Sequence, residues 1–151
     1  LSFETPLCGS SERGGSRGSS MNGKLRHFAI SVPDPQKAAA FYERALGMTR
    51  VGENDHPGAT AVYLTDGTVN LALLRYKTEE AAGGDPDRFG MHHFGFVVDD
   101  VEAVQGEIEA AGGNWLMGEA KDAGAFYEIK FRDPDGVIFD INEGGWRTGE
   151  D

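Results

Sequence analysis

Two histidines that could bind a metal ion stand at the same point of two similar segments of the chain. The segment His-Phe-Ala-Ile-Ser-Val begins at His27, and His-Phe-Gly-Phe-Val-Val begins at His93, 66 residues later. Alternating apolar residues are typical of a strand with one face on the core. Phe28 and Phe94 would then face the core, and each histidine would point to the opposite face. Because neutral imidazole is the commonest metal ligand, the repeat predicts two candidate ligands on one sheet surface.

The elements that must position these histidines also occur twice. Each His-Phe strand is followed by an acidic turn and an amphipathic stretch, first after Asp34-Pro35 and then after Asp99-Asp100. Gly47 closes the first stretch and Gly112-Gly113 closes the second, as expected for helix C-termini. Three strands are predicted after each helix: residues 48–53, 59–65 and 68–76 in the first copy, and residues 114–120, 125–132 and 137–142 in the second.

Each half of the chain is therefore predicted to form a βαβββ module, with module 1 at about residues 24–76, a linker at residues 77–90 and module 2 at about residues 91–146. A four-stranded sheet with one helix buries only one of its faces, so the two modules must pack or pair. The predicted fold class is α+β, a cup-shaped mixed sheet with the helices on the outside. We expect one domain over residues 23–148 and a disordered Gly- and Ser-rich tail or leader over residues 1–22.

Composition and charge argue against several classes of function. Acidic residues outnumber basic ones 25 to 14, for a formal net charge of -11, whereas nucleic-acid binding needs clustered Lys and Arg. No apolar run approaches the roughly 20 residues of a membrane helix, and no secretory signal pattern is present. Cys8 is the only cysteine, which excludes a disulfide within the chain. We therefore expect a cytoplasmic protein whose partner is a small molecule, with neither nucleic acid nor membrane.

Strand alternation places further polar side chains in the predicted cup. On the last strand the apolar neighbours of Asp140 would face the helix, which turns Asp140 and Asn142 toward the cup. On the strand before it, Glu128 and Lys130 would project the same way. Glu128 is the candidate catalytic acid or base, and Lys130 and Asn142 are candidate substrate-binding residues. Alternatively, Glu128 and Lys130 pair with each other on an exposed sheet surface, since such ion pairs are common and weak.

Four other residues with notable side chains are interpreted as structural. His92 has the wrong alternation for the cup, so we expect it on the helix side or at the strand edge. His56 lies in Asn-Asp-His-Pro-Gly, which indicates an exposed loop. Trp115 and Trp146 could line the mouth of the cup or close the core, and we favour the core.

These motifs resemble the vicinal oxygen chelate superfamily, which includes glyoxalase I, fosfomycin and bleomycin resistance proteins, methylmalonyl-CoA epimerase and type I extradiol dioxygenases. The resemblance rests on the two His-Phe strands, on the run Phe-Tyr-Glu-Arg-Ala-Leu-Gly-Met at residues 41–48 and on Asp-Pro-Asp-Gly at residues 133–136. It covers residues 24–146 and implies the glyoxalase/dioxygenase-like fold.

The resemblance also implies one divalent metal ion, held by His27, His93 and Asp140. Asp140 stands four residues after the turn glycine, where the family usually carries a ligating Glu. Two imidazoles and one carboxylate suit Fe²⁺ or Mn²⁺ with open positions, which we favour, and Zn²⁺, Ni²⁺ or Co²⁺ could bind the same set. Because two-module relatives often dimerise, a homodimer is expected, with the site formed within one chain or across two.

The reaction is less specified than the fold, because this superfamily hosts several chemistries on one cup. Relatives with four ligands carry another Glu or Gln on the fourth strand of module 1, where this chain has Leu71 or Ala72, and Asn70 would be a weak substitute. The remaining set resembles that of extradiol dioxygenases, which favours dioxygenase-like cleavage of a substrate whose vicinal oxygens are chelated to the metal. A glyoxalase-type lyase or a fosfomycin-resistance-type thiol transferase is the enzymatic alternative. A metal-free, ligand-sequestering protein of the bleomycin-resistance type is the non-enzymatic one.

Overall fold

The computed structural model describes residues 22–122 and 124–149. The predicted tail, with Cys8, therefore lies outside the described residues apart from Asn22. The described strands form one eight-stranded mixed sheet in the order β2-β3-β4-β1-β5-β8-β7-β6. No helix of the described part is long and apolar enough to cross a membrane.

Each half of the sheet follows the predicted order of one strand, one helix and three strands. The first half comprises β1 (Lys24–Ser31), α1 (Pro35–Leu46), β2 (Thr49–His56), β3 (Ala59–Thr65) and β4 (Asn70–Tyr76). The second comprises β5 (Gly90–Val97), α3 (Val101–Ala110), β6 (Asn114–Met117), β7 (Ile129–Arg132) and β8 (Ile138–Asn142). Strands β1 and β5 are antiparallel and join the two halves, whereas β1 pairs with β4, and β5 with β8, in parallel.

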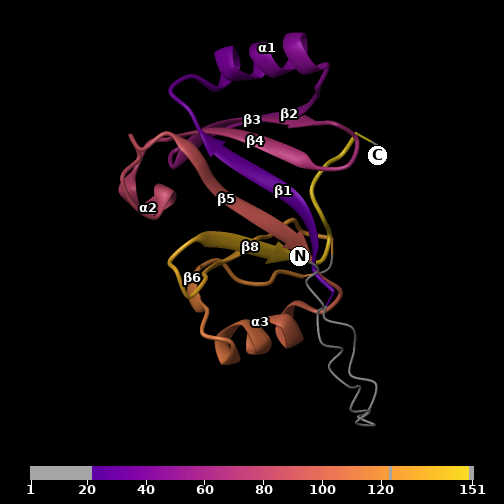
Figure 1. Cartoon of the computed structure of the whole chain (residues 1–151), viewed down its shortest axis with the longest axis vertical. Coiled ribbons are helices and arrows are strands. Elements are labelled where there is room, and N and C mark those ends of the chain that lie inside the picture. The colour runs from indigo at the N-terminus through magenta and orange to yellow at the C-terminus, as the bar shows by residue number, and fades with distance from the viewer. Residues whose placement is uncertain (1–21, 123, 150–151) are drawn as a thin grey trace, which may run out of the picture.

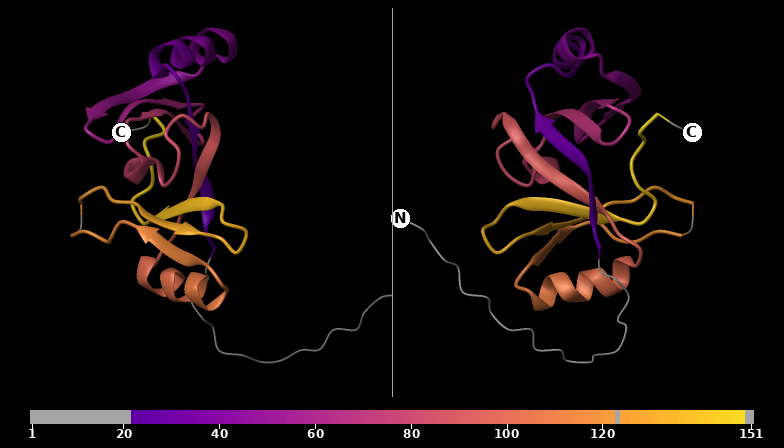
Figure 2. Two further views of the ribbon diagram at one scale, coloured as in Figure 1. Left: turned by 90° about the vertical axis from the view of Figure 1, so that its left-hand side faces the viewer. Right: turned by 45° about the vertical axis from the view of Figure 1, so that its right-hand side comes forward.

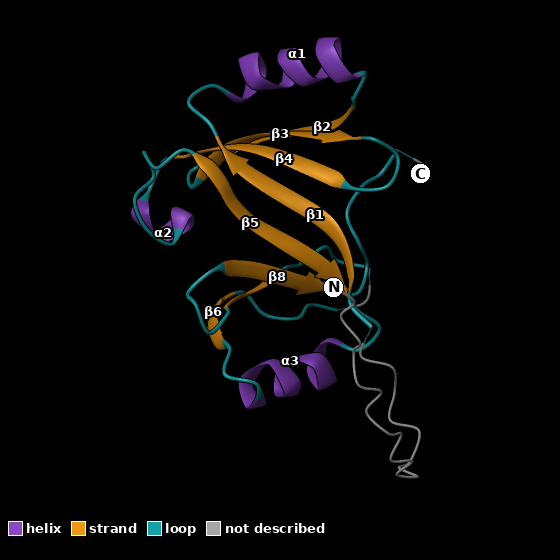
Figure 3. Cartoon of the chain, in the orientation of Figure 1, coloured by secondary structure: helices purple, strands orange, loops and turns teal. Residues whose placement is uncertain are grey.

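The helices lie on the outside of the sheet, as predicted, and local signals fix their ends. The Asp34 side chain accepts hydrogen bonds from the first backbone N–H groups of α1, and Gly47 ends that helix with a left-handed φ of 65°. Helices α1 and α3 occupy opposite ends of the molecule (Figures 1 and 3). Buried apolar side chains under α1 include Val62 and Leu73, and those under α3 include Phe131.

Three segments differ from the sequence prediction. Strand β2 continues to His56, beyond the predicted end at residue 53 and into the segment interpreted as a loop. The linker contains a short helix, α2 (Glu79–Ala82), which Thr78 caps at its N-terminus. Strands β6 and β7 are shorter than expected, because Gly118 has a φ of 88° and a Cβ atom there would collide with the backbone carbonyl of Glu128. This close approach ends both strands, and residues 118–128 contain no strand among those described.

The chain beyond β8 returns across the cup to the first half of the sheet. Figure 2 shows this C-terminal segment rising from β8 toward the strands of the first half. Its position is fixed by a hydrogen bond from Asn70 Nδ2 to the carbonyl of Arg147 (2.9 Å). The segment therefore covers part of the concave surface that the two halves form.

Candidate metal centre

Strand register brings His27, His93 and Asp140 together at the centre of the sheet. His27 on β1 lies opposite Gly95 on β5, and Gly95 lies opposite Asp140 on β8. His93 precedes Gly95 by two residues on β5, so it lies on the same face of the sheet, and its partner on β1 is Ala29. One ligand atom from each of the three side chains lies within 4.8 Å of the others, and all three residues are buried. A single chain thus assembles the predicted set, whose role as metal ligands stays a prediction.

Gly95 leaves the space in which this group is built. A Cβ atom at Gly95 would collide with Asp140 Oδ1 and would lie 2.7 Å from the Trp146 ring. Any side chain at this position would therefore displace the carboxylate or the indole. Gly95 separates His27 from Asp140 in the row across the strands, and its missing side chain allows the carboxylate to turn toward the imidazole.

The orientation of the His27 ring is fixed on both sides. The Asn70 amide donates through Nδ2 to the carbonyl of Arg147, so its Oδ1 is the acceptor for His27 Nδ1 at 3.0 Å. His27 is therefore protonated on Nδ1 and presents the lone pair of Nε2. The Trp146 indole stacks on the ring with centroids 4.7 Å apart and an interplanar angle of 6°.

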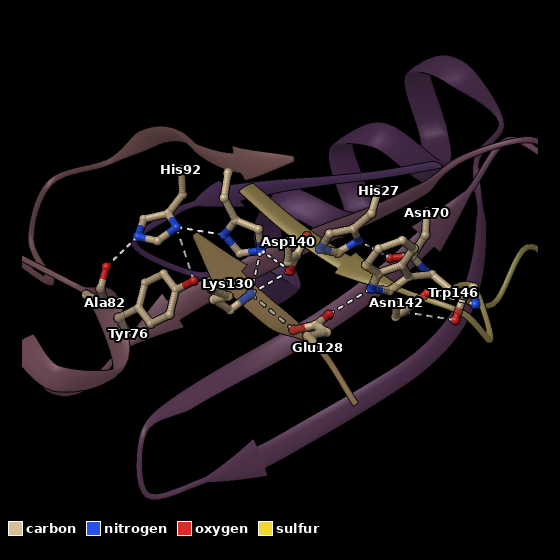
Figure 4. Close-up of polar contacts among 12 residues, drawn as sticks. His27, Asn70, Tyr76, Ala82, His92, Glu128, Lys130, Asp140, Asn142 and Trp146 are labelled. Atoms are coloured by element: carbon tan, nitrogen blue, oxygen red, sulfur yellow. Dashed lines mark hydrogen bonds and ion pairs between the residues drawn. The ribbon is translucent and has the colours of Figure 1, made fainter. Parts of the chain in front are cut away.

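The partly buried ammonium of Lys130 contacts Asp140 and Glu128 (Figure 4), and it also contacts His93. Lys130 Nζ is 2.6 Å from Asp140 Oδ2, 3.1 Å from Glu128 Oε2 and 3.3 Å from His93 Nε2. These three contacts match the three N–H donors of an ammonium. Trp146 Nε1–H donates to the other oxygen of Glu128 at 2.7 Å. Glu128 and Lys130 thus face the cup and pair with each other there, whereas the alternative placed their pair on an exposed sheet surface.

Burial and charge set the protonation of the group. Burial lowers the pKa of His93 to about 4 and also lowers the pKa of His27. Burial raises the pKa of Asp140, but the Lys130 ammonium 2.6 Å from Oδ2 outweighs this effect and holds the pKa well below its ordinary value. Burial lowers the pKa of Lys130, whereas the charges of Glu128 and Asp140 raise it above its ordinary value. At neutral pH the two imidazoles are therefore neutral, Asp140 is a carboxylate and Lys130 is an ammonium.

These residues fit a divalent cation. Asp140 Oδ1 is buried and has no hydrogen-bond partner among the described residues. A buried carboxylate oxygen without a partner is costly. One oxygen of the same carboxylate lies within 4.8 Å of a nitrogen of each imidazole. Nitrogen and carboxylate donors are the ligands that Mn²⁺, Fe²⁺ and Zn²⁺ accept. The Lys130 ammonium already contacts the other oxygen of Asp140, so it would have to withdraw for the carboxylate to bind an ion with both oxygens.

The register also locates the missing fourth ligand. Ala72 on β4 lies opposite Ala29, which lies opposite His93. This arrangement mirrors that of Asp140, which is separated from His27 by Gly95. Ala72 therefore occupies the position in the first half that corresponds to Asp140 in the second half, and its methyl group cannot ligate a metal.

A cavity of about 530 Å³ lies next to the candidate ligands without being lined by them. Three of its lining residues each contact the group directly: Asn70 and Trp146 contact His27, and Glu128 contacts Lys130. The wall also includes Glu53, Asn54, His56, Tyr63 and Phe126. One layer of side chains therefore separates a space of small-molecule size from the candidate metal centre.

The sequence interpretation was wrong for His92, Trp115 and Trp146. A register shift in the β1–β5 pairing skips His92, so it is a bulged residue whose Nδ1 lies 2.8 Å from His93 Nδ1. A bulge turns two successive side chains to one side, which alternation alone could not predict. Trp146 lies in the cup on His27 instead of closing the core, and Trp115 is 56% exposed.

Asn142 and His56 are placed as follows. The buried Asn142 side chain accepts a hydrogen bond from the backbone N–H of Gly145 (2.8 Å) and so shapes the turn after β8. Its predicted role in substrate binding stays a prediction. His56 is the exposed last residue of β2, and it lines the cavity.

Comparison with known proteins identifies the family of the chain. Residues 24–141 match the model of the Glyoxalase/Bleomycin resistance protein/Dioxygenase superfamily, and the chain belongs to this family. The superfamily resemblance seen in the sequence is thereby confirmed.

The relatives include enzymes of more than one kind. An ethylmalonyl-CoA/methylmalonyl-CoA epimerase from Cereibacter sphaeroides is 32% identical over 114 residues, covering 67% of this chain and 81% of the relative. A probable lactoylglutathione lyase from Vibrio parahaemolyticus is 31% identical over 129 residues, covering 80% and 90%. The crystal structure of methylmalonyl-CoA epimerase from Mycobacterium tuberculosis superposes with a TM-score of 0.65 at 20% identity, covering 85% and 92%, which establishes the shared fold alone.

Proposed function

We propose that this protein is a metal-dependent enzyme that acts on a small molecule held in the 530 Å³ cavity. The observation that carries the proposal is the buried convergence of His27, His93 and Asp140 within 4.8 Å. The partnerless Asp140 Oδ1 supports it, because a cation would satisfy that oxygen. When bound, a divalent ion would supply Lewis acidity that polarises neighbouring substrate oxygens.

Proton transfer at a carbon next to a carbonyl group is the reaction type that we favour. The relatives named an epimerase and a lyase support this class over oxygen-dependent cleavage. Glu128 would serve as the general acid or base, since it lines the cavity and lies one contact from the candidate ligands. Trp146 and Lys130 each donate to one of its oxygens and so hold the carboxylate in a fixed orientation.

Dioxygenase-like cleavage, which the sequence favoured, is the second candidate. Ala72 leaves the group with two imidazoles and one carboxylate, a set that suits Fe²⁺ with open positions. The two candidates share the metal ligands and differ in the need for oxygen.

A metal-free ligand-binding protein is the non-enzymatic alternative. It is supported by Lys130, whose ammonium already neutralises Asp140 at 2.6 Å. In that case the cavity would hold its ligand without any chemistry. The expected homodimer and the cytoplasmic location stay predictions for all three functions.

One set of assays separates the three candidates. The protein, loaded in turn with Mn²⁺, Fe²⁺, Co²⁺ and Zn²⁺, is incubated in D₂O with methylmalonyl and ethylmalonyl thioesters, and loss of the carbon-bound proton is followed by NMR. Oxygen uptake is measured in parallel with a panel of catechols. Metal-dependent proton exchange without oxygen uptake is expected, and it should disappear in Glu128→Gln while metal binding persists. Oxygen uptake would instead favour the dioxygenase. A protein that binds none of these metals would contradict both enzymatic proposals.

A further inference from the structure

The hydrogen bonds around His92 determine which nitrogen of each neighbouring imidazole carries the proton. His92 Nε2 lies 2.7 Å from the backbone carbonyl of Ala82, the last residue of α2. A carbonyl oxygen can only accept, so His92 Nε2 must carry a proton. In the neutral ring, His92 Nδ1 is then a lone pair that can only accept.

The same protonation follows from the opposite end of the chain of contacts. Lys130 Nζ lies 3.3 Å from His93 Nε2, and an ammonium can only donate, so His93 Nε2 must be a lone pair. The neutral His93 ring then carries its proton on Nδ1, which lies 2.8 Å from the His92 Nδ1 acceptor. The contact with Ala82 and the contact with Lys130 therefore give the same direction of donation. His93 Nδ1–H donates to His92 Nδ1, and His92 Nε2–H donates to the carbonyl of Ala82.

The β-bulge makes this contact possible. Regular alternation would send His92 to the helix side of the sheet, away from His93. The register shift between Ala29 and Ile30 in the pairing with β5 skips His92 and brings both histidines to one side. The Tyr76 ring packs on His92 with centroids 4.6 Å apart, and its hydroxyl lies 3.3 Å from His92 Nδ1. The bulge, the linker helix α2 and Tyr76 together hold the imidazole of His92 in place (Figure 4).

We propose that His92 is a positioning residue, which holds His93 in the tautomer whose Nε2 lone pair faces Asp140. The role in metal binding rests on the proposed function, whereas the tautomer does not. Without His92, the Nδ1–H of His93 loses its acceptor. Asp140 Oδ2, 3.4 Å from His93 Nε2, then becomes the competing acceptor for a proton on Nε2. That tautomer blocks the nitrogen that would bind the ion.

Nitrogen-15 NMR of the metal-free protein tests the tautomer directly, because long-range ring correlations distinguish protonated from unprotonated nitrogens. We expect a single Nδ1–H form of His93 in the wild type. In His92→Phe, which keeps an aromatic ring without hydrogen bonds, a share of Nε2–H should appear. In His92→Gln the amide oxygen can accept from Nδ1–H, so the wild-type form should return. Lys37→Met on the exposed side of α1 is the control, and its His93 spectrum should not change.

Titration with Zn²⁺ against a chromophoric chelator gives a second readout. Loss of an outer partner of a metal-ligating histidine typically weakens metal affinity about 10- to 100-fold. We expect a loss of this size in His92→Phe, a smaller loss in His92→Gln and none in Lys37→Met.

The outcomes separate this inference from the proposed function. Zn²⁺ binding with neither a tautomer change nor an affinity change in His92→Phe would overturn the inference and leave the proposed function standing. A tautomer change in a protein that binds no metal would support the inference and contradict the proposed function. An Nε2–H form of His93 in the wild type would overturn the inference even if the Phe variant failed to fold.

Discussion

Replacing Lys130 by Met should make the centre bind metal more tightly while making the metal-free protein less stable. In the wild type the ammonium lies 2.6 Å from Asp140 Oδ2, and the carboxylate is fully buried. An incoming cation must displace or approach this ammonium, which repels it. Met has a similar length and no charge, so the variant leaves the carboxylate to the metal alone.

The magnitude follows from the burial of the pair. Removing one partner of a buried ion pair costs about 3–5 kcal/mol, because the other charge is left uncompensated. At about 2–4 °C per kcal/mol for a chain of this size, the metal-free variant should melt roughly 10 °C lower than the wild type. A bound metal ion would again compensate the negative charge of Asp140. Since about 1.4 kcal/mol corresponds to a tenfold change, Zn²⁺ affinity should rise by roughly 10²-fold.

Thermal unfolding with and without Zn²⁺, together with a chelator competition titration, measures both effects. Lys37→Met on the exposed side of α1 is the matched control, because it removes one positive charge far from the centre and should change neither quantity. Lys130→Arg should keep the wild-type metal affinity within a few fold. If Lys130→Met bound Zn²⁺ no more tightly than the wild type, the view that the ammonium competes with the metal for Asp140 would be wrong.

Three further predictions follow from the same geometry. Gly95→Ala should destabilise the protein and abolish metal binding, because the added methyl collides with Asp140 Oδ1; thermal unfolding and Zn²⁺ titration check this, and retained metal affinity would contradict it. Trp146→Ala should speed the reaction of His27 with diethylpyrocarbonate, followed by peptide mass spectrometry, because the stacked indole covers that ring; an unchanged rate would mean that the indole does not shield it. The third concerns pH: His93 has its pKa lowered from 6.5 to about 4, so the unfolded chain binds more protons between these values. The free energy of unfolding of the metal-free protein should therefore fall as pH decreases from 6.5 to 4, by up to about 1.4 kcal/mol per pH unit from this residue. Urea unfolding should show a weaker dependence in His93→Asn, and equal slopes in both proteins would refute the assignment.

Much of the fold could be predicted because its signals are local and occur twice. The His-Phe strands at His27 and His93 alternate with period two, so their apolar faces fix the side on which each histidine lies. Asp34 and Gly47 mark the ends of α1 by capping chemistry that needs no tertiary context. The order of strands and helices, the outer position of the helices and the shared face of the candidate ligands all follow from such signals.

The rest depends on contacts between distant segments. The bulge at His92 is a property of the pairing of two strands, and the sequence of one strand does not contain it. The position of Trp146 depends on the gap at Gly95 and on the bond between Asn70 and Arg147, both far away in sequence. The late start of β7 likewise follows from the close approach of Gly118 to Glu128.

The most direct test of the central claim is the metal content of the protein, purified anaerobically without chelator, beside that of three ligand variants. We predict close to one equivalent of Fe, Mn, Co, Ni or Zn per chain in the wild type, or after addition of the metal. His27→Ala, His93→Ala and Asp140→Ala should each lose it, while Glu107→Ala on the exposed side of α3 retains it. A folded wild type that takes up no metal, or equal metal content in all four variants, would contradict the proposed centre.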